Sequence, residues 1–94
     1  MIKYLNGDFD EEILKDKILV DFYADWCGPC HMMSEVLEKI DSIDVLKVNV
    51  DKYPLIARRY GVMSIPSLIL FHNGNVEKTN VGFIDIDKLN KFIK

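Results

Sequence analysis

The sequence predicts an α/β fold in which a buried strand leads directly into a helix. Residues 18–24 form a nearly unbroken apolar run, as expected for a strand that is buried on both faces of a parallel sheet. A second strand is predicted over residues 44–50, with Lys47 in its middle. In residues 31–40, apolar side chains recur at i, i+3, i+4 and i+7, which is the spacing of one helix face. These apolar residues are Met33, Val36, Leu37 and Ile40.

Two further helices follow from local signals. Asp8, with Glu11 three residues later, predicts an N-cap and an acidic first turn for a short helix that runs to about Lys15. Pro54 at a first helical position predicts another helix, because its missing N–H has no intrahelical partner there. The apolar side of that helix is predicted to consist of Leu55, Ile56, Ala57 and Tyr60.

The last part of the chain predicts a hairpin and a final helix. Residues 67–71 and 76–81 are predicted strands joined by an Asn73-Gly74 turn. The final helix begins near Asp85 and is predicted to turn four apolar residues toward the core. No repeat or linker interrupts the chain, so residues 1–94 are expected to form one domain. The four apolar residues of this final helix are Ile86, Leu89, Phe92 and Ile93.

Cys27 and Cys30, the two cysteines of the chain, stand three residues apart between the strand and the helix. A bridge that closes so short a loop stabilises a fold by only about 2 kcal/mol in the chain-entropy model, compared with about 3 kcal/mol for a 15-residue loop. A redox role is therefore favoured over a structural one. A zinc site is disfavoured, because His31 and His72 lack the spacing of a second ligand pair and are expected to be solvated.

The placement of the two thiols predicts separate roles for them. Cys27 lies at a helix N-terminus, whose unpaired N–H groups and positive dipole end lower a thiol's pKa, so it is predicted to attack a substrate disulfide. Cys30 lies one turn further along, shielded by the first turn, and is predicted to resolve the mixed disulfide. Pro29 is tolerated in a first turn, and Gly28 removes side-chain bulk beside the sulfurs.

Asp21 interrupts the apolar strand that precedes the cysteines. Burial favours the neutral form of a carboxyl and raises its pKa, so Asp21 is a candidate acceptor for the Cys30 proton. The alternative is an acid that reaches solvent at the edge of the sheet. Lys47 lies within the second predicted strand, and strand pairing brings it near Asp21 unless it extends to the surface instead.

The chain resembles the thioredoxin family over nearly its whole length. The resemblance implies the thioredoxin fold, with a central mixed β-sheet of about five strands flanked by about four helices. It also implies Cys27 as the nucleophile, Cys30 as the resolving thiol, and Asp21 as a buried acid close to Lys47. The motifs that carry the resemblance are residues 20–30, which include Trp26-Cys27-Gly28-Pro29-Cys30, and residues 47–51, 60–67, 71–74 and 81–82.

The resemblance further implies how substrates dock and how the protein is recycled. The Ile65-Pro66 peptide bond is expected to be cis and to lie beside the sulfurs. The family's recycling enzyme is thioredoxin reductase, which draws its electrons from NADPH or ferredoxin; the substrates are disulfide-containing proteins, and no cofactor is needed beyond the Cys27–Cys30 disulfide. The implied docking surface consists of Trp26, Ile65, Pro66, Val81 and Gly82.

Three residues depart from the family's usual pattern. Glu35 stands where many members carry a proline that kinks the helix, Tyr23 stands where a second tryptophan is frequent, and His31 replaces the usual lysine. None of them is at a sulfur-bearing position. They bear on the choice of partner and on the path of the helix.

The composition restricts the partners and the compartment. Twelve basic and 15 acidic residues give a net charge of −3, which argues against nucleic acid as the main ligand. No apolar leader follows Met1, and no apolar run approaches the ~18 residues of a membrane span. We therefore expect a cytoplasmic monomer that acts as a general protein-disulfide reductase. The alternatives are a disulfide oxidase or isomerase, and a scaffold subunit that keeps the fold without turnover.

Overall fold

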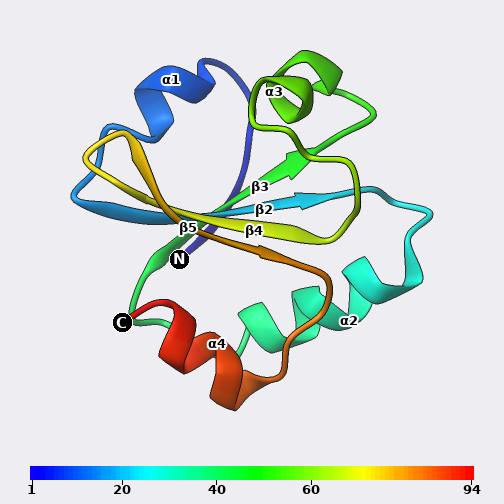
Figure 1. Ribbon diagram of the computed structural model, residues 1–94, viewed down its shortest axis with the longest axis vertical. Coiled ribbons are helices and arrows are strands. Elements are labelled where there is room, and N and C mark those ends of the chain that lie inside the picture. Colours follow the sequence, from blue (N-terminus) through cyan, green and yellow to red (C-terminus); the bar gives the residue numbers. More distant parts are fainter.

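The computed structural model describes residues 1–94 and has a five-stranded mixed sheet between two pairs of helices (Figure 1). The strands are β1 (Ile2–Tyr4), β2 (Lys17–Tyr23), β3 (Asp44–Asn49), β4 (Ser67–His72) and β5 (Asn75–Val81). The helices are α1 (Phe9–Glu12), α2 (Gly28–Leu37), α3 (Pro54–Arg59) and α4 (Ile86–Phe92).

The strand order is β1-β3-β2-β4-β5, which places β2 in the centre of the sheet. β3 runs parallel to both β1 and β2, whereas β4 runs antiparallel to β2 and to β5. Helices α1 and α3 cover one face of the sheet, and α2 and α4 cover the other (Figure 1). Because β2 has a strand on each side and helices over both faces, its apolar run is explained by burial in every direction.

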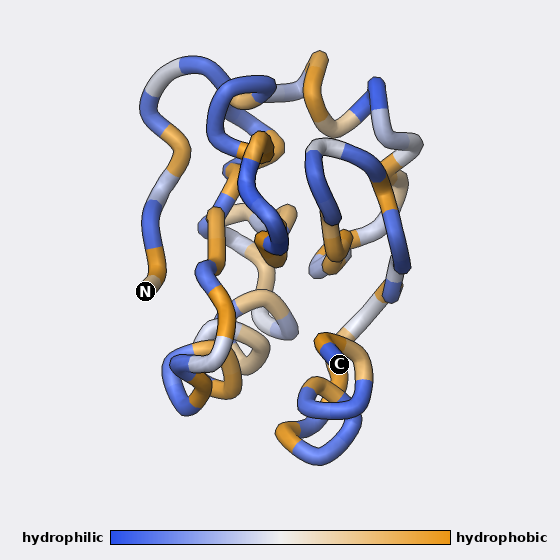
Figure 2. The backbone as a smooth tube through the Cα atoms, turned by 90° about the vertical axis from the view of Figure 1, so that its left-hand side faces the viewer, coloured by the Kyte–Doolittle hydropathy of each residue, from blue (hydrophilic) through white to orange (hydrophobic).

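Side chains of β2 alternate between the two faces. Ile18, Val20 and Phe22 belong to the core on the α1 and α3 side, while Leu19 packs with α2 and α4 on the other. Asp21 therefore points to the same side as Leu19, toward the helix that carries Cys30. In Figure 2 hydrophilic and hydrophobic segments alternate along the helical turns, as expected for helices that bury one side.

The hairpin between β4 and β5 has the predicted turn. Asn73 has a φ of 51° and Gly74 a φ of 83°, so both central residues lie in the left-handed region that Asn and Gly tolerate best. Such a two-residue turn matches the twist of the strands it joins. The hairpin sets β5 beside β4 and ends at Val81, close to the functional site.

The predicted helices are present, with some differences at their ends. Asp8 caps α1 as expected, accepting a hydrogen bond from the Glu11 N–H, but α1 ends at Glu12 and does not reach Lys15. α2 ends at Leu37, before Ile40. Pro54 begins α3, and Asp85 caps α4.

One expectation about packing is wrong, and one strand was not predicted. Leu55 was expected on the buried side of α3 but is 70% exposed, because the six-residue helix turns Ala57 to the core instead. β1 was not predicted at all. Its three residues include no buried one, and it is recognisable only from its pairing with β3.

We expect Leu37→Ala to lower the free energy of unfolding by about 2–5 kcal/mol, since it would leave a cavity between α2 and the sheet. Leu37 is completely buried. The matched control is Leu55→Ala, which should change stability by no more than about 0.5 kcal/mol. Urea unfolding of both variants makes the comparison. An equal loss in the two would contradict the packing described here.

Candidate active site at the junction of β2 and α2

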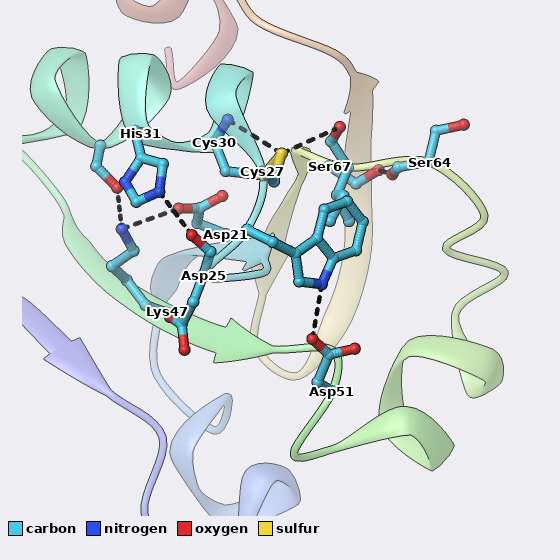
Figure 3. Close-up of a disulfide and its surroundings, with 12 residues drawn as sticks. Asp21, Asp25, Cys27, Cys30, His31, Lys47, Asp51, Ser64 and Ser67 are labelled. Atoms are coloured by element: carbon cyan, nitrogen blue, oxygen red, sulfur yellow. Dashed lines mark hydrogen bonds and ion pairs between the residues drawn. A yellow bond between two sulfur atoms is a disulfide. The ribbon is translucent and has the colours of Figure 1, made fainter.

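The two cysteines are joined by a disulfide at the start of α2 (Figure 3). Cys27 is the N-cap, and its Sγ accepts a hydrogen bond from the Cys30 N–H at 3.2 Å. Pro29 lies in the first turn, as predicted. The helix N-terminus thus directs a backbone donor at the sulfur of Cys27, an arrangement that stabilises negative charge on that atom.

Both cysteines are largely covered in the disulfide form. Cys27 was expected to be the exposed one, but its exposed fraction is only 5%, compared with 2% for Cys30. They pack with Ala24, Ile65 and Tyr23. The two sulfurs therefore differ in their hydrogen bonding more than in their exposure.

Gly28 is not required by packing within the protein. A Cβ added to it would meet no atom within 4 Å, so the space beside the sulfurs is open on this side. Its lack of a side chain leaves the approach to Cys27 free for a molecule that comes from solvent.

The loop before β4 lies against the disulfide. The Ile65–Pro66 peptide bond is cis, as the resemblance implies, and the Ile65 carbonyl oxygen lies 3.8 Å from Cys27 Sγ. The Gly82 N–H donates a hydrogen bond to the Pro66 carbonyl oxygen at 2.8 Å. Gly82 has a φ of +95°, which another residue would adopt only with strain. Val81, 64% exposed, pairs with the first residue of β4.

Trp26, the residue directly before Cys27, is exposed beside the disulfide. The residue is 73% exposed, yet its indole N–H donates a hydrogen bond to Asp51 Oδ2 at 2.9 Å. Asp51 follows β3, so this bond connects the active-site turn with the neighbouring loop. The structure therefore brings four of the five expected docking residues (Ile65, Pro66, Val81 and Gly82) together at the Cys27 side of the disulfide. It leaves Trp26, the fifth, exposed next to Cys27.

Asp21 is fully buried in the centre of β2. The alternative interpretation of Asp21, as a solvated acid at the edge of the sheet, is wrong because β2 is the middle strand. Neither carboxyl oxygen has a hydrogen-bond partner. Desolvation by burial raises the pKa of Asp21 to about 6, although the positive charge of Lys47 acts in the opposite direction.

Lys47 lies opposite Asp21 in the parallel pairing of β2 with β3. Its Nζ is 3.5 Å from Asp21 Oδ2, and the residue is only 4% exposed, so the alternative of a surface lysine is wrong. Nζ also donates a hydrogen bond to Ser34 Oγ of α2. The rings of Tyr23 and Tyr4 lie 4.8 Å and 5.6 Å from Nζ, which adds cation–π attraction.

A cavity of about 120 Å³ adjoins both Cys30 and the buried Lys47. This volume is enough to hold water. Asp21 lies behind Lys47, with its oxygens shielded from solvent. The cavity thus reaches Cys30 at one side and Lys47, the basic partner of the ion pair, at the other. It is lined by Cys30, Ser34 and Lys47, together with Tyr4, Tyr23 and His31.

The two histidines are exposed, as expected. His31 Nε2 lies 2.7 Å from the Asp25 carbonyl oxygen. His72 lies near Asp16 and Glu77 and pairs with Lys17 at the start of β2, the end of that strand away from the cysteines. No group of three His, Cys, Asp or Glu side chains is placed to hold a metal ion. No helix has the length and apolar character needed to cross a membrane.

Three neighbours of the site were not singled out from the sequence. Ser34 lies four residues after Cys30, a spacing that places both on one side of a helix, but its bond to Lys47 depends on how α2 packs on β3. Asp51 belongs to a motif that supports the family resemblance, without any indication that it binds Trp26. Tyr4 lies on the unpredicted strand β1.

The comparisons with known proteins agree with this geometry. The thioredoxin family model matches residues 1–94. Thioredoxin of Chlamydia caviae is 42% identical over 98 residues, covering 99% of this chain and 96% of its own length. Thioredoxin of Staphylococcus epidermidis is 44% identical over 88 residues, covering 88% and 85%.

A solved structure has the same fold. A mutant thioredoxin from Halobacterium salinarum superposes with a TM-score of 0.88 at 37% identity, covering 98% of this chain and 87% of that one. The redox group of such proteins is the cysteine pair itself, so their dithiol–disulfide exchange needs no bound cofactor. The chain belongs to the thioredoxin family and is a protein-disulfide reductase whose redox-active disulfide is Cys27–Cys30.

Proposed function

We propose that the chain reduces disulfide bonds in a broad range of cytoplasmic proteins, with Cys27 as the attacking thiol and Cys30 as the resolving thiol. The observation that carries these roles is the position of Cys27 as the N-cap of α2, where its sulfur receives the Cys30 N–H. A thiolate formed there is stabilised by a backbone donor and by the positive end of the helix.

The exchange takes place in two steps. The Cys27 thiolate attacks one sulfur of the substrate disulfide, forming a mixed disulfide, and the other substrate sulfur leaves as a thiolate. Cys30 then gives up its proton and attacks Cys27 Sγ, which releases the second substrate sulfur. Two electrons have passed to the substrate, and the Cys27–Cys30 disulfide has formed.

Asp21 is the proposed acceptor of the Cys30 proton. A carboxyl with a pKa of about 6 is mostly ionised at neutral pH yet takes up a proton more readily than an ordinary aspartate. The proton crosses the cavity that Cys30 shares with Lys47, and Lys47 stabilises the Asp21 carboxylate before the transfer.

The substrate is proposed to dock on the surface beside Cys27. Ile65 and Pro66 contribute backbone and apolar contact close to the sulfur, and Val81 and Gly82 extend this surface along the end of β5. Trp26 supplies an exposed ring that Asp51 holds in place. A surface with few charges and exposed backbone groups suits substrates of varied sequence.

Residues 1–94 are proposed to act as one domain and as a monomer. Thioredoxin reductase is the proposed partner that restores the dithiol, with electrons from NADPH or ferredoxin. The direct test is insulin reduction with dithiothreitol as the electron source. Precipitation of the insulin chains above the dithiothreitol background supports the reductase, whereas a rate equal to the background favours a scaffold.

We expect Cys30→Ser to trap substrates and Cys27→Ser not to do so. Without Cys30, the Cys27 thiolate still attacks, but no internal thiol releases the mixed disulfide, because a serine hydroxyl is far less acidic than a thiol. Non-reducing gel electrophoresis after incubation with a disulfide-containing protein measures the adduct, and dithiothreitol reverses it. Equal trapping by both variants would refute the division of roles, and trapping by neither would favour the scaffold.

We expect Asp21→Asn to fold and to reduce insulin about tenfold more slowly at about pH 7. A tenfold loss of rate is less than the full contribution of a positioned base, because water in the cavity accepts the Cys30 proton in place of Asp21. The measurement is turnover between about pH 6 and 9. If Asp21→Asn matches the native protein throughout that range, Asp21 is not the proton acceptor.

The same substitution should stabilise the protein at neutral pH. Because the folded-state pKa of Asp21, about 6, lies above its ordinary value of 3.8, folding favours the protonated form. The stability that Asp21 contributes is therefore fully present below about pH 4 and lost as the pH rises through 6, a difference of about 3 kcal/mol. Asn resembles the neutral acid. The free energy of unfolding of Asp21→Asn should therefore equal that of the native protein at about pH 4 and exceed it by about 3 kcal/mol at about pH 7.

A further inference from the structure

Ser34 connects α2 to the buried pair formed by Asp21 and Lys47. Lys47 Nζ donates a hydrogen bond to Ser34 Oγ. It also lies 3.5 Å from Asp21 Oδ2 (Figure 3). Ser34 follows Cys30 by four residues, and both line the same cavity. The serine hydroxyl is thus placed between the helix that carries the resolving thiol and the lysine that faces the buried acid.

The ammonium group of Lys47 is shared among several neighbours. One N–H is directed to Ser34, and the rings of Tyr23 and Tyr4 attract the charge from two other strands. Asp21 Oδ2 lies 3.5 Å from the ammonium, at the long limit of a hydrogen bond, and this contact lowers the pKa of Asp21 without a closer donor reaching either oxygen. A direct, charge-assisted bond would favour the carboxylate strongly over the neutral acid. Burial sets the direction of the Asp21 pKa shift, and the position of Lys47 Nζ adjusts how readily Asp21 takes up a proton.

We propose that Ser34 is a positioning residue for the resolving step, which holds Lys47 Nζ toward α2 and so leaves the Asp21 carboxylate free to accept the Cys30 proton. In that step the proton passes from Cys30 Sγ to Asp21, the Cys30 sulfur bonds to Cys27 Sγ, and the substrate sulfur leaves with the electron pair of the broken bond. The inference rests on the proposed role of Asp21 as proton acceptor.

The charged and titratable groups around Asp21 are few. β3 contributes Lys47, β1 contributes Tyr4, and β2 itself contributes Tyr23. β4 places the apolar Leu68 directly opposite Asp21, and α4 contributes the apolar Leu89 to the core on this face. At the α2 side of the cavity the titratable groups are Cys30, His31 and Asp25. His31 is the competing source of a pH effect, because it lines the cavity.

The test measures single-turnover reduction of insulin by the dithiol protein, with acid quenching and gel analysis to follow decay of the mixed disulfide. In Ser34→Ala, Lys47 is free to bond to Asp21. The pH midpoint of the resolving step should therefore move down by about one unit, the size of effect that one added hydrogen bond to a carboxylate produces. Ser34→Thr keeps the hydroxyl and should restore the native midpoint. Ser42→Ala, at an exposed serine before β3, is the matched control and should leave it unchanged.

Two backgrounds show whether the effect passes through Lys47. In a protein that already carries Lys47→Gln, adding Ser34→Ala should cause no further shift in the pH midpoint of the resolving step. A shift of the same size in this double variant would overturn the inference. In a protein that already carries His31→Gln, the shift caused by Ser34→Ala should persist. Its loss would assign the effect to His31 instead.

Asp21→Asn separates failure of this inference from failure of the proposed function. If the pH dependence of resolution is unchanged in Asp21→Asn, Asp21 is not the proton acceptor. If Asp21→Asn abolishes that dependence while Ser34→Ala leaves the native midpoint in place, the role of Asp21 stands and the role of Ser34 is wrong.

Discussion

The burial of one carboxyl in the central strand is the constraint on which the rest of the site depends. Asp21 lies in β2, surrounded by strands and helices, where an ionised group loses its hydration. The fold tolerates this cost because the parallel register of β2 and β3 sets Lys47 directly opposite. A buried acid with a partial counter-charge accepts a proton near neutral pH, which suits it to a reaction in which a thiol must lose one.

The disulfide is placed by the same strand. β2 ends at Tyr23, and four residues later Cys27 caps α2, so the strand that carries the acid also delivers the sulfurs to the helix N-terminus. The cis-proline loop comes from β4, the antiparallel neighbour of β2. The groups proposed for attack, resolution and substrate docking are thus arranged around the end of one strand, and α2 adds Ser34 beside Lys47.

The sequence predicted the elements whose signals are local, and it failed where tertiary pairing decides. The apolar run of β2, the cap at Asp8 and the Asn73-Gly74 turn were correctly predicted because each depends on a few adjacent residues. β1 was missed, because three residues without a buried side chain carry no periodicity. The pairing of Lys47 with Asp21 stayed open until the strand register was known, and the bond to Ser34 required the docking of α2 on β3.

The ionisation of Asp21 in the native disulfide form is the property on which the proposed mechanism depends most directly. A titration of the Asp21 side-chain carboxyl carbon by nuclear magnetic resonance measures this ionisation without any substitution, with the half-exposed Asp44 as a reference in the same spectra. We expect a midpoint of about 6 for Asp21, and one below its ordinary value for Asp44, whose pKa the neighbouring Lys15 lowers. A midpoint for Asp21 at or below its ordinary value of 3.8 would contradict the account, because desolvation would then not govern the site.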